Sequence, residues 1–496
     1  MNFSRPLSIV AVAGLALCTA ACGGSSGGKG DAGGTDTDGA GDGDGDGDVD
    51  LTEPGQAGER LQLRLRGVEG AMHPEGFYDT ELDIDCNFLS TDEGLYCLPH
   101  GGGANFFADA NCEVPLHTGA SGCAEVPNDT EGQLVSVAEY SCGDGLWTAH
   151  RLGPLHTGPV YMATDAGCVE DMNNDPNTSL LFTLEDVDLS MFVAGERVIR
   201  GDADARVVSL EGEDGSRRTA GLANADGETC FGTDQFASGG PRCLPEVRAY
   251  ATGNDYADAT CSDDALAGYT TFEAACGFMP ERLLRYLTIG NESCDAGVTI
   301  ELREVGDPLD SAYSETGNGC EPITGDSRTF FTLGDAIDAT TLPGVVSVAR
   351  GNEVQARYWG PDADTPGTYI QLFRQNGETC GSGRTDDGKT RCLPQNRLGF
   401  ADPTHFSDAG CTQGVIAWGF DCAEQHTHAE RRELPMPGAC FEHVTEMYEL
   451  SPYTGTLYQG TPGSCAEVAP SPGDTYLALG DAVDPKSFPE IVTVRQ

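Results

Sequence analysis

The run Thr390-Arg391-Cys392-Leu393-Pro394 holds a tripeptide that occurs twice more in the chain, as Cys97-Leu98-Pro99 and Cys243-Leu244-Pro245. Outward from each copy, further cysteines follow at similar intervals. Setting aside Cys18 and Cys22, the other cysteines form three sets of six: Cys86, Cys97, Cys112, Cys123, Cys142 and Cys168; Cys230, Cys243, Cys261, Cys276, Cys294 and Cys320; and Cys380, Cys392, Cys411, Cys422, Cys440 and Cys465. Self-similarity with a period near 150 residues indicates three copies of one structural unit.

Two further motifs repeat with the cysteines. An aromatic residue, an Asp two positions on and the third cysteine recur as Phe107/Asp109/Cys112, Tyr256/Asp258/Cys261 and Phe406/Asp408/Cys411. A tyrosine stands seven residues before the sixth cysteine at Tyr161, Tyr313 and Tyr458. The repeated aspartates are interpreted as turn caps, because a short carboxylate side chain readily accepts hydrogen bonds from the following backbone.

The cysteines are predicted to form disulfides. Zinc sites use cysteine pairs two to four residues apart, whereas the spacings within these sets all exceed ten residues. Spacing does not select one connectivity among the 15 that six cysteines allow, and nearest neighbours are preferred here because the intervening stretches are short and turn-rich. The expected bonds are Cys86–Cys97, Cys112–Cys123, Cys142–Cys168, Cys230–Cys243, Cys261–Cys276, Cys294–Cys320, Cys380–Cys392, Cys411–Cys422 and Cys440–Cys465.

The hydrophobic pattern predicts an all-β chain. Alternating runs such as 61–65, 133–140 and 369–373 are separated by Gly, Asp, Asn and Pro every 8–12 residues, and only 271–287 has a weak helical pattern. Two arrangements of the three units, 57–198, 199–350 and 351–496, remain open. One is a six-bladed propeller-like ring, in which 61–64 pairs with 491–494 across the seam; the other is three separate β domains.

The N-terminus predicts export. Residues 1–21 hold one early Arg, an apolar run and then small residues, which is the pattern of a signal peptide. The run Thr19-Ala20-Ala21-Cys22 resembles a bacterial lipoprotein signal, which implies that Cys22 is acylated and becomes the first residue of the mature chain. Two acyl chains suffice for stable anchoring to a membrane. Gly23 after the cysteine implies the outer membrane by the same resemblance, and a plain secreted protein is the alternative.

An acidic tether is expected over 22–56, because Gly, Asp, Ser and Thr cannot bury enough apolar surface to fold. It contains a twelve-residue pattern typical of a calcium loop, with carboxylates at alternating positions and a final Glu. The candidate Ca²⁺ ligands are Asp42, Asp44, Asp46, Asp48, Asp50 and Glu53. No helices are expected to flank this loop, so an acidic spacer is the competing interpretation.

The Cys-Leu-Pro, aromatic-x-Asp-x-x-Cys and Tyr-x₆-Cys motifs together resemble cysteine-repeat surface lipoproteins of myxobacterial type, over about 57–496. That resemblance implies an envelope protein and transfers no catalytic residue. The charge excludes a nucleic-acid binder that relies on a basic face, since 28 basic and 79 acidic residues give −51.

Few residues point to catalysis. His426-Thr427-His428 lies near no complete metal-ligand pattern, and 430–433 is expected to be a solvated strand or loop. The sequence therefore favours a lipid-anchored, non-enzymatic cell-envelope protein that binds an unknown protein or surface polymer. The alternatives are a hydrolase of extracellular polysaccharide, with two paired carboxylates, and a calcium-dependent adhesin. No cofactor other than Ca²⁺ is expected.

Overall fold

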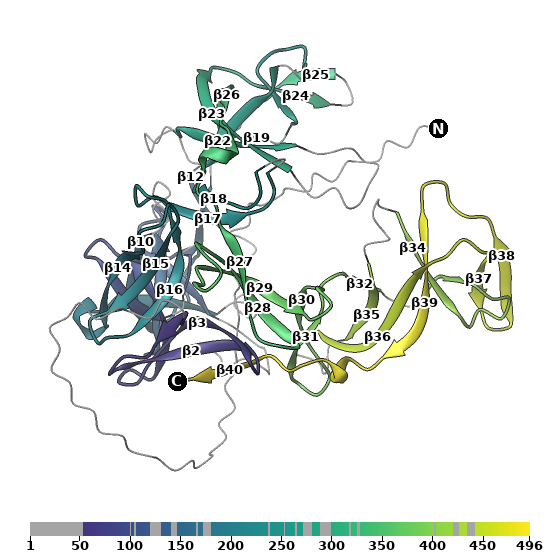
Figure 1. The fold of residues 1–496 in the computed structure, drawn as a ribbon, viewed down its shortest axis with the longest axis horizontal. Helices are drawn as coiled ribbons and strands as arrows, with labels where there is room; N and C mark the ends of the chain where they lie inside the picture. The colour runs from purple at the N-terminus through teal and green to yellow at the C-terminus, as the bar shows by residue number, and fades with distance from the viewer. Residues whose placement is uncertain are drawn as a thin grey trace, which may run out of the picture.

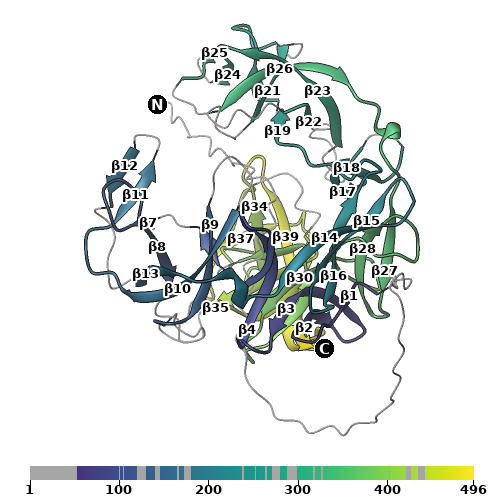
Figure 2. The same cartoon turned by 90° about the vertical axis from the view of Figure 1, so that its left-hand side faces the viewer.

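The computed structural model is all-β, as predicted, with short 3-10 helices in place of longer ones. It describes residues 53–99, 101–103, 106–119, 130–139, 146–164, 167–171, 180–236, 239–251, 253–262, 265–270, 280–287, 299–316, 319–324, 328–400, 403–419, 426–433 and 442–496. The strands form a central hub and three arms that leave it in different directions (Figures 1 and 2).

The hub is built from three groups of strands. The first group is β1 (Gly55–Gln56), β2 (Leu61–Val68), β3 (Ala71–Asp79), β4 (Ile84–Ser90) and β5 (Leu95–Pro99). The second is β14 (Ala194–Arg200), β15 (Arg206–Gly212), β16 (Arg217–Ala223), β17 (Thr229–Thr233) and β18 (Arg242–Pro245). The third is β27 (Val346–Arg350), β28 (Val354–Gly360), β29 (Thr368–Arg374), β30 (Cys380–Arg384), β31 (Thr390–Pro394) and the last strand, β40 (Val492–Arg495).

Each arm follows one hub group in the chain. Arm 1 holds β6 (Gly102–Gly103), β7 (Phe106–Phe107), β8 (Pro115–Gly119), β9 (Leu134–Glu139), β10 (Leu146–Leu155), β11 (Tyr161–Thr164), β12 (Gly167–Glu170), β13 (Leu180–Asp186) and the 3-10 helix η1 (Leu189–Met191). Arm 2 holds β19 (Ala249–Ala251), β20 (Asp255–Tyr256), β21 (Ala267–Thr270), β22 (Arg282–Leu287), β23 (Thr299–Leu309), β24 (Tyr313–Thr316), β25 (Gly319–Pro322), β26 (Thr329–Ala336) and η4 (Ala339–Thr341).

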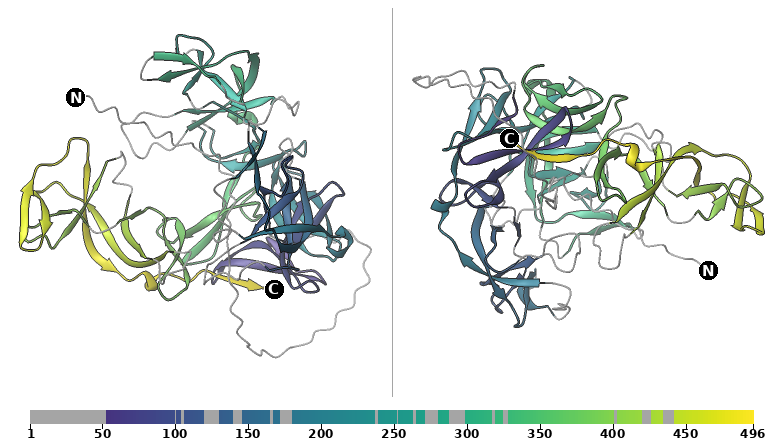
Figure 3. Two further views of the ribbon diagram at one scale, coloured as in Figure 1. Left: turned by 180° about the vertical axis from the view of Figure 1, so that it is seen from behind. Right: turned by 90° about the horizontal axis from the view of Figure 1, so that it is seen from below.

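Arm 3 repeats this order of elements. It holds β32 (Arg397–Gly399), β33 (His405–Phe406), β34 (Gly414–Trp418), β35 (His428–Glu433), β36 (His443–Pro452), β37 (Leu457–Thr461), β38 (Ser464–Val468), β39 (Thr475–Val483) and η6 (Pro485–Ser487). In arm 2 the strands β19-β21-β26-β23-β22 close into a small barrel. Figure 3 shows arms 1 and 3 leaving the hub on different sides.

The hub strands pair in one closed circuit. A continuous sheet runs β18-β17-β16-β15-β14-β5-β4-β3-β2-β40. Isolated bridges then join β18 to the start of β27 through Arg242 and Gly344, β29 to β30 through Phe373 and Thr379, and β31 to the start of β40 through Arg391 and Glu490. The circuit therefore passes through all three hub groups and returns to β2.

The first and last parts of the described chain pair, as the ring arrangement predicted, but the paired residues are 64–67 and 492–495 and not 61–64 and 491–494. β2 and β40 pair antiparallel, with Arg64 opposite Arg495 and Leu65 opposite Val494. The Leu63 and Gln496 backbones exchange two hydrogen bonds, at 3.0 and 2.9 Å. β2 and β40 thus cover each other's open edges, which would otherwise expose unpaired backbone groups.

The six-bladed propeller prediction is wrong for the described residues. No propeller forms in this part of the chain because the second half of each unit pairs within its own arm and so adds no blade to the hub. Separate domains do not describe the hub either, because β5 of the first unit pairs with β14, with Tyr96 opposite Ala194.

Cys-Leu-Pro marks the junction between hub and arm. Leu98, Leu244 and Leu393 are fully buried, each in a cluster that includes arm residues. The preceding cysteines, also fully buried, belong to the hub clusters. Successive strand residues point to opposite faces, so the cysteine packs into the hub core and the leucine into the core shared with the arm. The proline is the last residue of the strand.

Candidate functional site

The tip of each arm is a three-stranded element built from the repeated motifs. In arm 1, Phe107 of β7 lies opposite Tyr161 of β11. The corresponding pairs are Tyr256 with Tyr313 in arm 2 and Phe406 with Tyr458 in arm 3. The aromatic residue and the tyrosine therefore meet in all three tips, although about 50 residues separate them in sequence.

The repeated aspartates cap the loop that carries the third cysteine, as predicted. Asp408 Oδ1 accepts hydrogen bonds from the Thr412 and Gln413 backbones at 2.8 and 2.7 Å, and Oδ2 accepts from Gly410 at 3.1 Å. Asp109 accepts from three backbone amides of its own loop in the same way. Hydrogen bonding to the charged form lowers the pKa of both carboxyls, through Gln413 and Val114 first.

The loop holds the third cysteine in an unusual backbone conformation. Cys112, Cys261 and Cys411 have φ of 56, 47 and 52°, in the left-handed region that residues with a side chain rarely adopt. With Asp83, they are the residues other than glycine with positive φ in the described part of the chain. The repeated carboxylate therefore stabilises a strained loop.

The disulfides correct part of the predicted connectivity. The first and second cysteines of each set are bonded: Cys86–Cys97, Cys230–Cys243 and Cys380–Cys392. The third cysteine bonds the sixth and not the fourth: Cys112–Cys168, Cys261–Cys320 and Cys411–Cys465. The predictions Cys112–Cys123, Cys142–Cys168, Cys261–Cys276, Cys294–Cys320, Cys411–Cys422 and Cys440–Cys465 are therefore wrong. The fourth and fifth cysteines of each set lie outside the described residues.

The pairing of the tip strands explains this correction. β11 pairs with both β7 and β12, so the loop after β7 and the strand β12 meet at the tip. The Cys112 and Cys168 Cα atoms are consequently 5.7 Å apart, at a sequence separation of 56, which is a distance that a disulfide can span.

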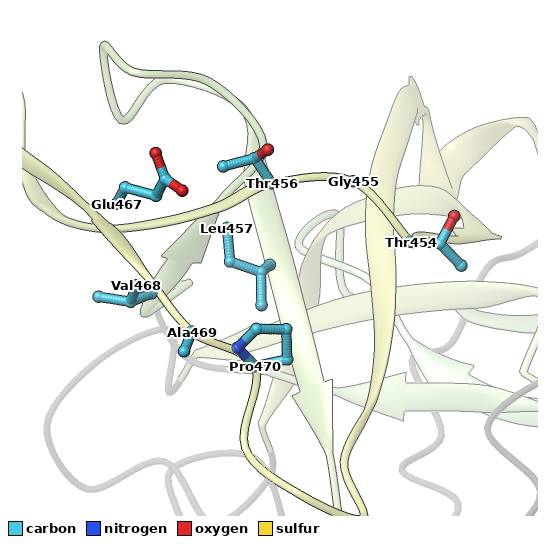
Figure 4. Close-up of a pocket in the computed structure, with 8 residues that line it drawn as sticks. All are labelled: Thr454, Gly455, Thr456, Leu457, Glu467, Val468, Ala469 and Pro470. Atoms are coloured by element: carbon cyan, nitrogen blue, oxygen red, sulfur yellow. The ribbon is translucent and has the colours of Figure 1, made fainter.

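A shallow depression lies at the tip of arm 3 (Figure 4). Thr454, Gly455, Thr456 and Leu457 form one wall, and residues 467–470 form the other. Leu457 is buried, whereas most of the other lining residues are exposed. Among the lining residues Glu467 is the one titratable group, and no buried polar group accompanies it.

A second, more polar cavity lies at the root of arm 3, where the hub hairpin β29–β30 meets the arm. We call this cavity of about 720 Å³ the root cleft. Its polar wall is formed by Arg374, Glu378, Asn396, Thr427, His428 and Glu449. Ser487 of the 3-10 helix η6 and the next residue, Phe488, line one side.

Hydrogen bonds organise the wall of the root cleft. Arg374 Nη1 donates to Glu378 Oε2 at 2.9 Å, and the Thr427 hydroxyl donates to Glu378 Oε1 at 3.1 Å. The Thr427 hydroxyl is also 2.9 Å from His428 Nδ1. Phe488 supports the wall, with its ring 5.1 Å from the Arg374 guanidinium and edge-on to His428. These side chains are positioned before any ligand binds.

His428 is a neutral member of this wall near pH 7. Burial lowers the pKa of His428, and the nearby Glu378 and Glu449 only partly offset that effect. Its Nδ1 lies 4.0 Å from Glu378 Oε1, too far for a hydrogen bond. Because the Thr427 hydroxyl donates its proton to Glu378, the neutral ring donates from Nδ1 to that hydroxyl and leaves Nε2 as an acceptor.

A buried ion pair lies beside the root cleft on the same strands. Arg397 Nε donates to Glu430 Oε2 at 2.6 Å, and both side chains are almost fully buried. Arg432 also donates to Glu430, at 2.7 Å from Nε to Oε1. The expectation of a solvated 430–433 is therefore wrong for Glu430, because a parallel pairing of β32 with β35 brings Arg397 to it.

The remaining predicted site residues lie elsewhere. Cys22, Asp42, Asp44, Asp46, Asp48 and Asp50 lie outside the described residues, and Glu53, which is described, is exposed. His426 packs edge-on against Trp418. Over the described residues no group of three or more His, Cys, Asp or Glu is placed to hold a metal ion. No helix in that part of the chain is long and apolar enough to cross a membrane.

Sequence reasoning singled out His428 but missed Glu378, Asn396, Thr427 and Glu449. A signal for Glu378 was present, because Asn376-Gly377-Glu378-Thr379-Cys380 matches Asp226-Gly227-Glu228-Thr229-Cys230 in spacing. Its role required the tertiary structure, since its partner Thr427 lies 49 residues away.

The fold and its tips define a class of protein: an all-β chain with six disulfides in its described part, a closed hub and three projecting arms. A family of unknown function, DUF7481, matches residues 222–490. That match covers more than half of the chain, so the protein belongs to the DUF7481 family. Neither the curated proteins nor the solved structures contain a match to the chain.

Proposed function

We propose that the protein is an exported envelope lipoprotein, anchored through Cys22, whose hub and arms form a non-enzymatic binding scaffold. The observation that carries the proposal is the set of disulfides that close each hub hairpin and each arm tip. Such bonds form and persist in oxidising compartments outside the cytosol. The signal-like residues 1–21 agree with export, and an acylated Cys22 would attach the scaffold to the outer membrane.

We also infer that the three units are copies of one ancestral unit. The support is that β2–β3, β15–β16 and β28–β29 each carry one irregularity in register, at Arg64/Leu65, Val208/Ser209 and Arg357/Tyr358. The three 3-10 helices also start alike, with Asp188, Asp338 and Asp484 accepting a hydrogen bond from the backbone two residues on. Such bulges are usually inherited within a family.

The test of anchoring uses Cys22→Ala and Cys18→Ala in the full chain. Metabolic labelling with a radioactive fatty acid should mark the wild type and Cys18→Ala, and Cys22→Ala should lose the label and leave the membrane fraction. Equal labelling of Cys22→Ala and the wild type, or wild-type protein without label, would overturn the lipoprotein proposal.

The root cleft supports a second candidate function, a hydrolase of extracellular polysaccharide. Two carboxylates, Glu378 and Glu449, line the same cavity, and glycoside hydrolysis generally uses such a pair. Release of reducing sugars from envelope polysaccharide, lost in both Glu378→Gln and Glu449→Gln, would favour the hydrolase over the binding scaffold. Turnover that persists in both variants would exclude these two carboxylates.

A further inference from the structure

The junction between hub and arm is filled differently in the three units. In arm 1, Ile84 and Leu134 pack into one apolar cluster around Leu98, Ala149 and Phe192. At the root of arm 2, Arg282 Nη1 binds both oxygens of Glu228, at 2.9 and 3.1 Å. At both junctions the corresponding positions are therefore occupied by side chains that pack together or pair with each other.

The root of arm 3 has the carboxylate but not the arginine. Glu378 and Glu228 both stand two residues before the first cysteine of their sets, after a glycine with φ of 85 and 86°. His428 corresponds to Arg282, because each begins the strand that pairs in parallel with the strand after Cys-Leu-Pro. In arm 3 the shorter, neutral His428 therefore stands at the position from which Arg282 binds the carboxylate in arm 2. The root cleft lies beside His428.

The groups that line this cavity have a definite chemistry. The charges of Arg374 and Glu378 are paired with each other, and His428 is neutral because burial lowers its pKa. Two amides, Asn376 and Asn396, and the Ser487 hydroxyl add further donors and acceptors to the lining. Glu449 supplies a carboxylate, which repels anions, as does the overall charge of −51.

We propose that the root cleft of arm 3 binds a neutral, hydroxyl-rich ligand, namely a segment of uncharged saccharide. Each sugar hydroxyl both donates and accepts, so it matches a wall of mixed amide, hydroxyl, imidazole and carboxylate groups. The pre-ordered contacts among Arg374, Glu378 and Thr427 reduce the entropy that binding costs. This inference rests on the proposed binding function and names the ligand class of one site.

The test converts the junction of arm 3 into that of arm 2. In His428→Arg, the guanidinium should reach Glu378 as Arg282 reaches Glu228, and fill the cleft without unfolding the arm. The matched control is Arg282→His, which opens the junction of arm 2 and leaves the root cleft intact. Thermal unfolding of both variants should confirm that they fold.

Binding is measured by calorimetry on the full-length lipoprotein in detergent, with maltohexaose, cellohexaose and mannohexaose as neutral probes and polygalacturonate as the anionic one. We expect at least one neutral probe to bind, about tenfold or more weakly to His428→Arg and within about twofold of wild type to Arg282→His. Thr427→Val should also weaken binding.

Three results would overturn the inference: no neutral probe binds at millimolar concentration, only polygalacturonate binds, or His428→Arg binds as tightly as the wild type. None of them affects the lipoprotein proposal, because acylation of Cys22 and membrane attachment are measured separately. A chain that is acylated but binds no saccharide therefore contradicts this inference alone.

Discussion

At the scale of single residues, His73 shows how position decides chemistry. It lies on β3 and stacks on Tyr369 of β29, with ring centroids 3.7 Å apart and an interplanar angle of 9°. Its Nδ1 is buried and has no hydrogen-bond partner among the described residues. Burial lowers the pKa of His73 to about 4, so the imidazole is neutral in the folded hub.

This shift predicts a loss of stability in acid. The unfolded chain binds a proton at His73 below about pH 6.5, whereas the folded chain binds it only near pH 4, so stability is full above pH 6.5 and falls as the pH drops between these values. The expected loss is on the order of 3 kcal/mol. His73→Phe keeps the stacked ring and removes the proton, so its free energy of unfolding should lack that part of the pH dependence. Denaturant unfolding of both proteins at pH 7 and pH 4 measures the difference, and equal acid losses would contradict the assignment.

Residues whose partners are close in sequence could be predicted. Asp109, Asp258 and Asp408 cap their loops as expected, because a carboxylate bonds the backbone two to five residues on. Glu430 was expected to be solvated, and it is buried because Arg397, 33 residues away, binds it. The sequence does not display a partner that the parallel pairing of β32 and β35 supplies.

At the scale of elements, the arm tips show why the predicted disulfide connectivity was partly wrong. Cys86 and Cys97 lie on a hairpin, β4–β5, so a local prediction sufficed. Cys112 and Cys168 meet only after β7, β11 and β12 have formed a sheet. The weak helical pattern over 271–287 also did not predict the structure of 282–287, since Arg282–Leu287 is a strand of the arm 2 barrel. In both cases tertiary pairing overrode the local signal.

The third-to-sixth bond should contribute more stability than the hairpin bond. It closes a loop of 54 residues in arm 3, against 12 for Cys380–Cys392, and the chain-entropy model gives about 4 and about 3 kcal/mol respectively. Cys411→Ala with Cys465→Ala should therefore speed hydrogen exchange in β33, β37 and β38 strongly. Cys380→Ala with Cys392→Ala is the matched control, and its effect should centre on β30 and β31. Unchanged exchange at the tip would contradict the role of the bond.

At the scale of the whole molecule, the closing pair β2–β40 joins the two ends of the described chain. Without it, β2 would present an open edge, and the hub circuit would end at β31. The Val494 side chain is 40% exposed and packs little. The stabilising contribution of this residue therefore comes from its backbone hydrogen bonds. Hydrogen-bonded pairs occur at every second position of an antiparallel ladder. Leu63 and Gln496 form such a pair, so Leu65 and Val494, two residues along, also exchange backbone hydrogen bonds.

Closure predicts a sharp difference between two substitutions at Val494. Val494→Pro removes the N–H that bonds Leu65 and should lower the free energy of unfolding by about 1–3 kcal/mol. Val494→Thr keeps the strand hydrogen bonds and should change it by less than about 0.5 kcal/mol. Thermal or urea unfolding compares the two. Equal stabilities would mean that the seam does not contribute to the fold.

The sequence by itself predicted the all-β class, the three cysteine sets and the turn-capping aspartates, and one of its two open arrangements also paired the strands that close the hub. Each of these follows from alternation, spacing or hydrogen bonding within a few residues. The tertiary structure decided the single hub with three arms, the third-to-sixth disulfides and the open root of arm 3. Those depend on pairings between strands tens to hundreds of residues apart, such as the parallel pairing that brings His428 to the position that Arg282 holds in arm 2.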